Sequence, residues 1–108
     1  MSNVNIKPAI IAGSGLLTMP GLTIEETLTV DTPWGQPSGP VYKGRLQGVE
    51  VLFMTRHGDA HTIPPHKVNY RANIAALKQE GATHLLAYNA VGGICADCDT
   101  GSLVVADQ

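Results

Sequence analysis

Two consecutive prolines, Pro64–Pro65, are the feature that most restricts how this chain can fold. Proline lacks a backbone N–H and fixes φ near the helical value, so it is accepted in the first turn of a helix and disfavoured further inside. We therefore predict a helix that begins near His66 and ends before Gly81, a residue suited to the position after a helix. Its buried face is predicted from apolar residues spaced i, i+4, i+7, namely Tyr70, Ile74 and Leu77, with Val68, Ala72, Ala75 and Ala76 alongside.

Short apolar or β-branched segments on both sides of this helix are typical of strands. Pro8–Ala12 ends at a glycine turn, and Val41–Leu46 and Val49–Thr55 flank Gln47–Gly48, a spacing that predicts a hairpin. The other predicted segments are an extended one within Leu22–Gly39 that ends in a structured loop, a short buried strand at His84–Asn89 and a strand at Ser102–Ala106. Strand, helix and strand in this order indicate an α/β fold with a right-handed crossover.

The chain has 108 residues, and its 7 Lys or Arg and 9 Asp or Glu give a formal net charge of -2. This balance supplies neither a basic surface for nucleic acid nor an acidic tail. Hydrophobic residues make up 44% and charged residues 15%, which is typical of one globular domain. No apolar stretch approaches the roughly 20 residues of a membrane helix, and no secretory signal is visible. We therefore expect no membrane partner and a cytoplasmic location.

Cys95 and Cys98 are the only cysteines, too few and too close in sequence to hold the fold together by disulfides. A redox pair and half of a zinc site are alternatives, but the surrounding segment is predicted to be a loop without a second pair. Two loop or core cysteines without special chemistry are therefore favoured. His57, His61 and His66 lie within one predicted loop and not on a helix, so they form no helical His pair and we expect no metal site.

Three segments that follow predicted strands carry groups suited to an anion. Gly13–Gly15 offers backbone N–H groups and the Ser14 hydroxyl, without the spacing of a dinucleotide or Walker motif. Arg56–Gly58 adds a guanidinium and an imidazole, and Asn89–Gly93 adds further backbone donors. Each segment alone is also compatible with an ordinary turn. Together, at strand ends, they predict an anion pocket with phosphate as its ligand, while no Asp-His-Ser or Cys-His set indicates nucleophilic hydrolysis.

These motifs, with Asp31–Ser38 and Pro64–Ile74, resemble those of the purine nucleoside phosphorylases. The segments Ala76–Lys78 and Asn89–Ile94 narrow the resemblance to the 5'-methylthioadenosine and methylthioinosine phosphorylase branch. The resemblance implies an α/β fold whose mixed central sheet is flanked by helices in three layers. It covers nearly the whole chain, but chains of that family are much longer. Residues 1–108 are therefore expected to be the amino-terminal part of a single phosphorylase domain.

The activity that this resemblance implies is reversible phosphorolysis. Phosphate attacks the anomeric carbon of a purine nucleoside, which is methylthioadenosine, methylthioinosine or a 6-oxopurine nucleoside. The products are the free purine base and the (methylthio)ribose 1-phosphate. Inorganic phosphate is implied as co-substrate, with no metal or organic cofactor, and the family assembles as homotrimers or hexamers.

Site residues can be carried over from the family by matching motifs. The implied phosphate-binding residues are Ser14, Arg56, His57, Asn89 and Ala90, the last through its backbone N–H. The implied nucleoside-binding wall consists of Ala90, Val91 and Gly92. The family's base-activating Asp or Asn, its base-stacking Phe and its ribose-contacting Met segment have no counterpart here, so no catalytic residue is predicted. Asn89 stands where the mammalian enzymes carry Thr, which hints at a bacterial subgroup acting on 6-oxopurine nucleosides or methylthioinosine.

Two other interpretations compete with this one. Arg-His-Gly after a strand also occurs in histidine phosphatases, although there it follows the first strand and is continued differently. The second alternative is a truncated, non-catalytic fragment that binds phosphate or nucleoside. It is suggested by the predicted strand at Ser102–Ala106, which has no succeeding element to cover its far side.

Overall fold

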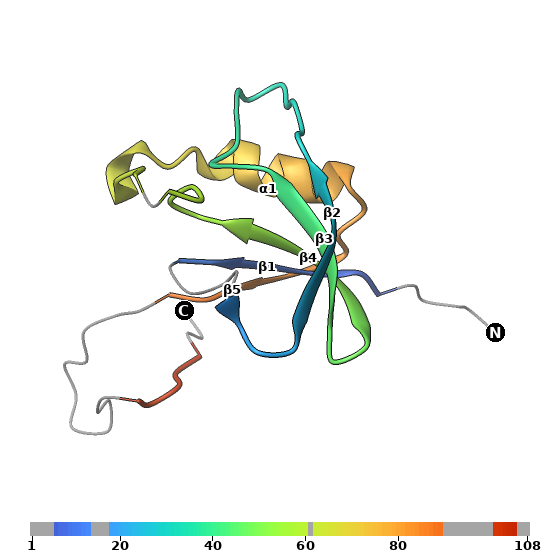
Figure 1. Ribbon diagram of the computed structural model, residues 1–108. Helices are drawn as coiled ribbons and strands as arrows, with labels where there is room; N and C mark the ends of the chain where they lie inside the picture. The colour runs from blue at the N-terminus through green and yellow to red at the C-terminus, as the bar shows by residue number, and fades with distance from the viewer. Residues whose placement is uncertain (1–5, 14–17, 61, 90–100, 106–108) are drawn as a thin grey trace.

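The computed structural model describes residues 6–13, 18–60, 62–89 and 101–105, in which a five-stranded sheet carries a helix on one side (Figure 1). The strands lie in the order β2-β3-β4-β1-β5. Their bounds are β1 Pro8–Ala12, β2 Leu22–Leu28, β3 Val41–Leu46, β4 Val49–Thr55 and β5 His84–Ala87. β1 pairs in parallel with β4 and β5, whereas β3 pairs antiparallel with β2 and β4. The sheet is mixed, and the predicted α/β class is confirmed.

The hairpin of β3 and β4 has the predicted bounds and the predicted turn. Gln47 and Gly48 both have positive φ, 50° and 82°. A two-residue turn of this kind has the same sense of twist as the strands that it joins. β1 also has its predicted bounds, and β2 lies within the predicted extended segment. The loop after β2 is closed by a bridge between Thr32 and Gly35.

The helix α1, Tyr70–Gln79, begins later than predicted. Pro65–Lys67 form a separate 3-10 turn, and the helix proper starts where the Asn69 side chain accepts a hydrogen bond of 3.1 Å from the backbone N–H of Ala72. Such a cap satisfies one of the free N–H groups of the first turn. The predicted end is confirmed, because Gly81 follows the helix with a φ of 97°.

The predicted buried face of α1 is only partly right. Leu77 is buried, but Tyr70 and Ile74 are 55% and 52% exposed. The residues that α1 buries are Ala72, Asn73, Ala76 and Leu77. Two alanines at the contact allow the helix to approach the sheet closely, so the contact face is rotated away from the bulkier residues that the apolar spacing picked out.

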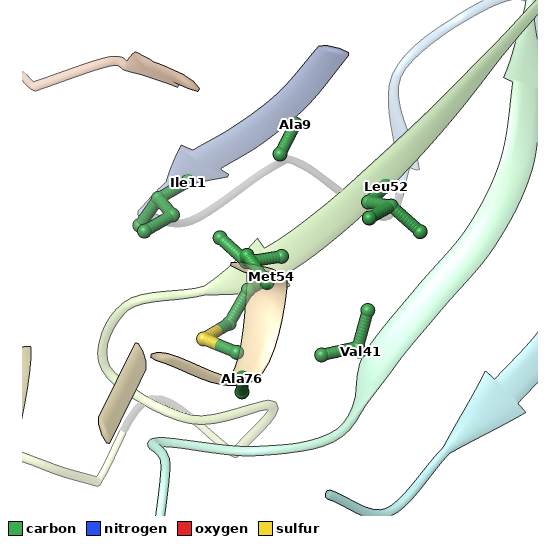
Figure 2. Packing of buried hydrophobic residues seen from close by; sticks show 7 residues of the cluster. Ala9, Ile11, Val41, Leu52, Met54 and Ala76 are labelled. Atoms are coloured by element: carbon green, nitrogen blue, oxygen red, sulfur yellow. The ribbon is translucent and has the colours of Figure 1, made fainter. Parts of the chain in front are cut away.

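The strands bury side chains on both faces of the sheet, in the alternation expected of β structure. On the face covered by α1, the core consists of Ala9, Ile11, Val41, Leu52, Met54, Ala76 and Leu77 (Figure 2). On the opposite face the core consists of Ala12, Tyr42, Val51 and Phe53, with Ile10, Met19, Leu22 and Leu46 packed against it. β1, β3 and β4 contribute to both cores, and β4, with Val51–Thr55 all buried, is the best-buried strand of the described residues.

Gly44 allows β2 and β3 to approach each other closely. A Cβ atom at this position would lie 2.1 Å from the Thr23 carbonyl oxygen and 3.1 Å from the Phe53 ring. The register between the two strands shifts between Ile24 and Glu26, as at a β-bulge. Bulges bend and twist a strand, so β2 is curled at this point of the sheet.

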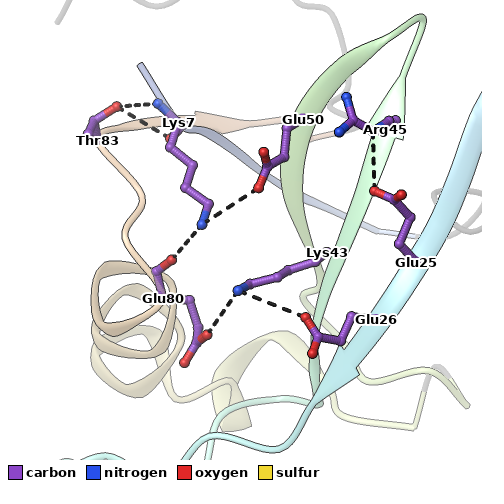
Figure 3. Close-up of polar contacts among 8 residues, drawn as sticks. All are labelled: Lys7, Glu25, Glu26, Lys43, Arg45, Glu50, Glu80 and Thr83. Atoms are coloured by element: carbon purple, nitrogen blue, oxygen red, sulfur yellow. Dashed lines mark hydrogen bonds and ion pairs between the residues drawn. The ribbon is translucent and has the colours of Figure 1, made fainter. Parts of the chain in front are cut away.

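Ion pairs join the carboxyl end of α1 to the sheet (Figure 3). The Lys7 ammonium donates to the Glu80 carbonyl oxygen at 3.1 Å, and it lies 3.9 Å from the Glu50 carboxylate. Lys43 lies 3.9 Å from both Glu26 and Glu80. Such partly exposed pairs contribute at most about 1 kcal/mol each, so the cores above dominate the free energy of folding.

The strand predicted at His84–Asn89 is confirmed as β5, but its predicted length and burial are wrong, and the strand predicted at Ser102–Ala106 is absent from the described residues 102–105. β5 ends at Ala87, and all four of its residues are exposed, because it pairs only with β1 and little of the described chain packs over it. Residues 102–105 are exposed and form no strand. β-branched residues favour a strand only where a neighbouring strand is available to pair with them. Among the described residues, no helix is long and apolar enough to cross a membrane.

Candidate functional site

The site residues predicted from strand ends converge because β4, β1 and β5 are parallel. The carboxyl ends of parallel strands meet at one edge of a sheet, which is where α/β proteins bind ligands. Arg56 directly follows β4, and Asn89 lies two residues after β5. The end of β1 lies between them, and its Ala12 carbonyl accepts a hydrogen bond of 2.9 Å from the Arg56 backbone N–H.

The Arg56 side chain bridges from β4 to the segment after β5. Its Nη2 donates to the Tyr88 carbonyl oxygen at 2.6 Å, and its Nη1 donates to the Asn89 side-chain oxygen. Tyr88 is itself joined to β1, since its backbone N–H donates to the Ile11 carbonyl oxygen at 2.8 Å. A guanidinium has five N–H donors, and these two bonds use only two of them. The group is therefore held in one orientation while it retains donors for an anion.

His57 is held by the far end of its own loop. Its Nδ1 lies 2.8 Å from the Ile63 carbonyl oxygen, and the Ile63 backbone N–H donates to the His57 carbonyl oxygen at 3.0 Å. A carbonyl oxygen only accepts, so Nδ1 carries the proton in this contact. These two bonds hold the ring against the end of its own loop.

Asp59 was missed by the sequence analysis. Its carboxylate accepts hydrogen bonds from the Thr55 hydroxyl at 2.7 Å and from the Tyr42 hydroxyl. Burial, together with the bond to Asp59 and the charge of its carboxylate, raises the pKa of Tyr42 to about 12. Tyr42 is 17 positions away from Asp59, so no local sequence signal predicts this contact.

A second missed contact ties α1 to the loop before β3. Asn73 is buried, its side-chain oxygen accepts from the Ser38 backbone N–H at 2.8 Å, and its side-chain nitrogen donates to the Ser38 hydroxyl at 3.0 Å. In addition, a Cβ atom at Gly58 would lie 3.2 Å from the Ser38 carbonyl oxygen, so the site loop runs close to this segment. The sequence analysis included Asn73 only within the Pro64–Ile74 segment that resembles the family, and predicted no contact for it.

The structure thus places Arg56, His57 and Asn89 at one edge of the sheet, with Arg56 and Asn89 in direct contact. The other predicted site residues, Ser14, Ala90, Val91 and Gly92, lie outside the described residues, as do His61, Cys95 and Cys98. Within the described part of the chain, no group of three or more His, Cys, Asp or Glu side chains is arranged to hold a metal ion.

Comparisons with known proteins identify the family of this chain. The model of the phosphorylase superfamily matches residues 7–108. A probable S-methyl-5'-thioinosine phosphorylase from Xanthomonas campestris is 51% identical over 108 residues, which are 100% of this chain and 43% of that protein. An S-methyl-5'-thioadenosine phosphorylase from Pyrococcus furiosus is 46% identical over 102 residues, 94% of this chain and 39% of that protein.

Solved structures give the same result. A methylthioadenosine phosphorylase from Schistosoma mansoni, in complex with adenine, is 42% identical with a TM-score of 0.70 and covers 77% of this chain and 30% of that one. A methylthioadenosine phosphorylase from an Antarctic soil metagenomic library is 45% identical with a TM-score of 0.68 and covers 76% and 29%.

The chain therefore spans less than half the length of the relatives that it matches. None of these matches supports the histidine phosphatase alternative. Because the family model matches the chain from residue 7 to residue 108, this protein belongs to the phosphorylase superfamily.

Proposed function

We propose that the chain is the amino-terminal portion of a nucleoside phosphorylase, a pentosyltransferase that cleaves a purine nucleoside with inorganic phosphate. The observation that carries this proposal is the Arg56 guanidinium, held by Asn89 and the Tyr88 carbonyl beside His57. Family membership and the names of the relatives support it. In the proposed site, phosphate binds at the edge formed by the carboxyl ends of β4, β1 and β5.

The phosphate would be bound by an arginine fork and by polar groups around it. A guanidinium matches two phosphate oxygens at once, and a fixed orientation lowers the entropy lost on binding. We assign His57 and Asn89 to the same ligand, and by resemblance we add the Ser14 hydroxyl and the Ala90 backbone N–H. No metal or organic cofactor is part of the proposal.

In the proposed reaction, a phosphate oxygen forms a bond to the anomeric carbon while the bond from that carbon to the purine nitrogen breaks. The departing base takes the bonding electron pair and must be protonated or hydrogen-bonded. The sugar passes through an oxocarbenium-like state that a nearby phosphate dianion stabilises. The residues of this chain hold the phosphate in place, and the group that activates the base is expected in the part of the domain that the chain does not include.

The substrate that we favour is methylthioinosine or a 6-oxopurine nucleoside, with methylthioadenosine as the alternative. The Xanthomonas relative is named for the thioinosine substrate. By resemblance alone, Asn89 stands where the mammalian adenosine-type enzymes carry Thr. Ala90, Val91 and Gly92 are assigned to the wall beside the sugar and base. By resemblance, we propose that the complete protein assembles as a homotrimer or hexamer.

The decisive experiment uses the product of the complete reading frame that encodes this chain. We expect it to release free base and ribose 1-phosphate from one of these nucleosides only when phosphate is present. Comparing methylthioinosine with methylthioadenosine at equal concentrations identifies the preferred base. Equal release of base in phosphate-free buffer would indicate a hydrolase and refute the proposal.

The second candidate, a non-catalytic binding fragment, is favoured by the short span of the chain relative to its relatives. If the natural reading frame ends at Gln108, the chain should bind phosphate without cleaving any nucleoside. Titration calorimetry with inorganic phosphate, combined with the assay above, separates this candidate from an active phosphorylase.

A further inference from the structure

The Asp59 carboxylate has two hydroxyl partners that the proposed phosphate contacts do not use. Tyr42 comes from β3 and is 8% exposed, and Thr55 ends β4 and is 7% exposed. Asp59 itself lies at the surface, and each of its two carboxylate oxygens accepts from a different hydroxyl. A surface carboxylate is therefore anchored to two side chains of the sheet.

Asp59 belongs to the loop that carries Arg56 and His57. At the start of this loop, the Gly58 backbone N–H donates to the Thr55 carbonyl oxygen at 3.3 Å. At its end, Ile63 holds both the backbone and the ring of His57. The bonds of Asp59 lie between these two points, so they fix the middle of the loop onto β3 and β4.

Gly39 lies beside the Asp59 carboxylate. A Cβ atom at Gly39 would lie 3.7 Å from the Asp59 carboxylate and 3.8 Å from the Thr55 hydroxyl, in ordinary contact with both. A carboxylate only accepts, so both hydroxyls can donate to it. An asparagine at the same place would offer one accepting oxygen and one donating nitrogen, and it would satisfy only one of the two bonds as they stand.

We propose that Asp59 is a positioning residue for phosphate, which holds the Arg56–His57 loop in its binding geometry through Tyr42 and Thr55. This inference rests on the proposed function. It differs from the phosphate contacts themselves because Asp59 acts on the ligand through the loop. A negative charge would repel phosphate directly, but here it is directed toward two hydroxyls of the sheet.

The test uses the complete phosphorylase and measures the KM of phosphate and of nucleoside separately. Asp59→Ala and Asp59→Asn should raise the phosphate KM by about tenfold, because small displacements of binding groups are costly, while the nucleoside KM changes less than about twofold. Thr55→Val should act in the same direction, and Thr55→Ser, which keeps the hydroxyl, should restore the phosphate KM. Glu25→Gln is the matched control, an exposed acid that pairs with Arg45 beside the start of β4.

Direct titration of inorganic phosphate gives a second readout that is independent of turnover. If Asp59→Ala fails to fold, Tyr42→Phe and Thr55→Val each remove one donor and leave the carboxylate in place. Normal phosphate binding and phosphate KM in folded Asp59 and Thr55 variants would overturn the inference alone. A wild-type protein that neither binds nor requires phosphate would overturn the proposed function as well.

Discussion

β4 and β5 lie on either side of β1 and run parallel to it, yet most of β4 is buried and β5 is exposed. Val51–Thr55 of β4 are buried without exception, whereas every residue of β5 is exposed. Leu52 and Leu85 allow a direct comparison of burial in the two strands, because both lie opposite Ala9 in register. Leu52 is 0% exposed and Leu85 is 45% exposed.

The two strands differ in their neighbours more than in their own sequences. β4 is paired on both sides and has side chains packed over both faces, while β5, within the described residues, is paired on one side. Similar apolar residues can therefore be core residues in one strand and surface residues in the next. The proposed phosphate site includes residues from the ends of both strands, since Arg56 follows the buried β4 and Asn89 follows the exposed β5.

The largest effect is expected from truncating the two matched leucines. Leu52→Ala should lower the free energy of unfolding of this chain by about 2–5 kcal/mol, because it leaves a cavity under α1. Leu85→Ala should cost roughly 1 kcal/mol or less, since its side chain is half exposed. Chemical denaturation followed by circular dichroism measures both. Equal losses in the two variants would show that β5 is as well covered as β4.

Repeating the leucine pair in the complete protein sharpens the comparison. If further polypeptide packs on β5, the cost of Leu85→Ala should rise toward that of Leu52→Ala.

The next largest effect is expected at the functional end of β4. Arg56→Ala should weaken phosphate binding by about 1.5–3 kcal/mol, because it removes a charge-assisted contact to the dianion. Arg56→Lys should restore only part of this, since an ammonium cannot contact Asn89, Tyr88 and phosphate as a planar fork does. Steady-state kinetics in which each substrate is varied separately provide the measurement. A raised nucleoside KM with an unchanged phosphate KM would contradict the assignment.

A smaller effect is expected at Tyr42 of β3, the strand beside β4, where the free energy of unfolding should depend on pH. Tyr42 is buried, and its pKa of about 12 lies above the ordinary value of 10.0. The folded state therefore holds the phenolic proton more tightly than the unfolded state, and this stabilisation is complete below pH 10 and is lost as the pH rises toward 12. Between pH 9 and pH 11 the free energy of unfolding should fall by about 1 kcal/mol for this reason.

Tyr42→Phe is the control for this pH dependence, because lysines titrate in the same range. The variant should be less stable at pH 9 and should lose less stability than the wild type by pH 11. Parallel pH profiles for the two proteins would show that Tyr42 does not contribute.

The smallest effect is expected at the end of β5. Asn89→Ala removes a side chain that orients the Arg56 guanidinium, so phosphate binding should weaken by about 0.5–1.5 kcal/mol. Because Asn89 is expected to act partly through Arg56, adding Asn89→Ala to Arg56→Ala should cost less than it does alone. Phosphate titrations of the two single variants and the double variant form the test. Strict additivity would mean that the two residues bind phosphate independently.

The sequence by itself determined the features that depend on neighbouring residues. The bounds of β1 and of the β3–β4 hairpin follow from apolar runs and from Gln47–Gly48, and the end of α1 follows from Gly81. These signals act within a few residues, so they are present before any tertiary contact forms. The sequence signals that place Arg56 and Asn89 at strand ends are equally local. The parallel pairing that joins those ends was anticipated from the order of strand, helix and strand.

Only the tertiary structure decided which apolar residues are buried and which polar groups meet. Tyr70 and Ile74 have the spacing of a core stripe but lie outside it, because Ala72 and Ala76 let the helix pack on a different face. The exposure of β5 depends on what lies beside it, which its own residues do not encode. The contacts of Asp59 with Tyr42 and of Ser38 with Asn73 join positions 17 and 35 residues apart. Such pairs form only when the sheet and helix have brought distant segments together, so no local pattern marks them.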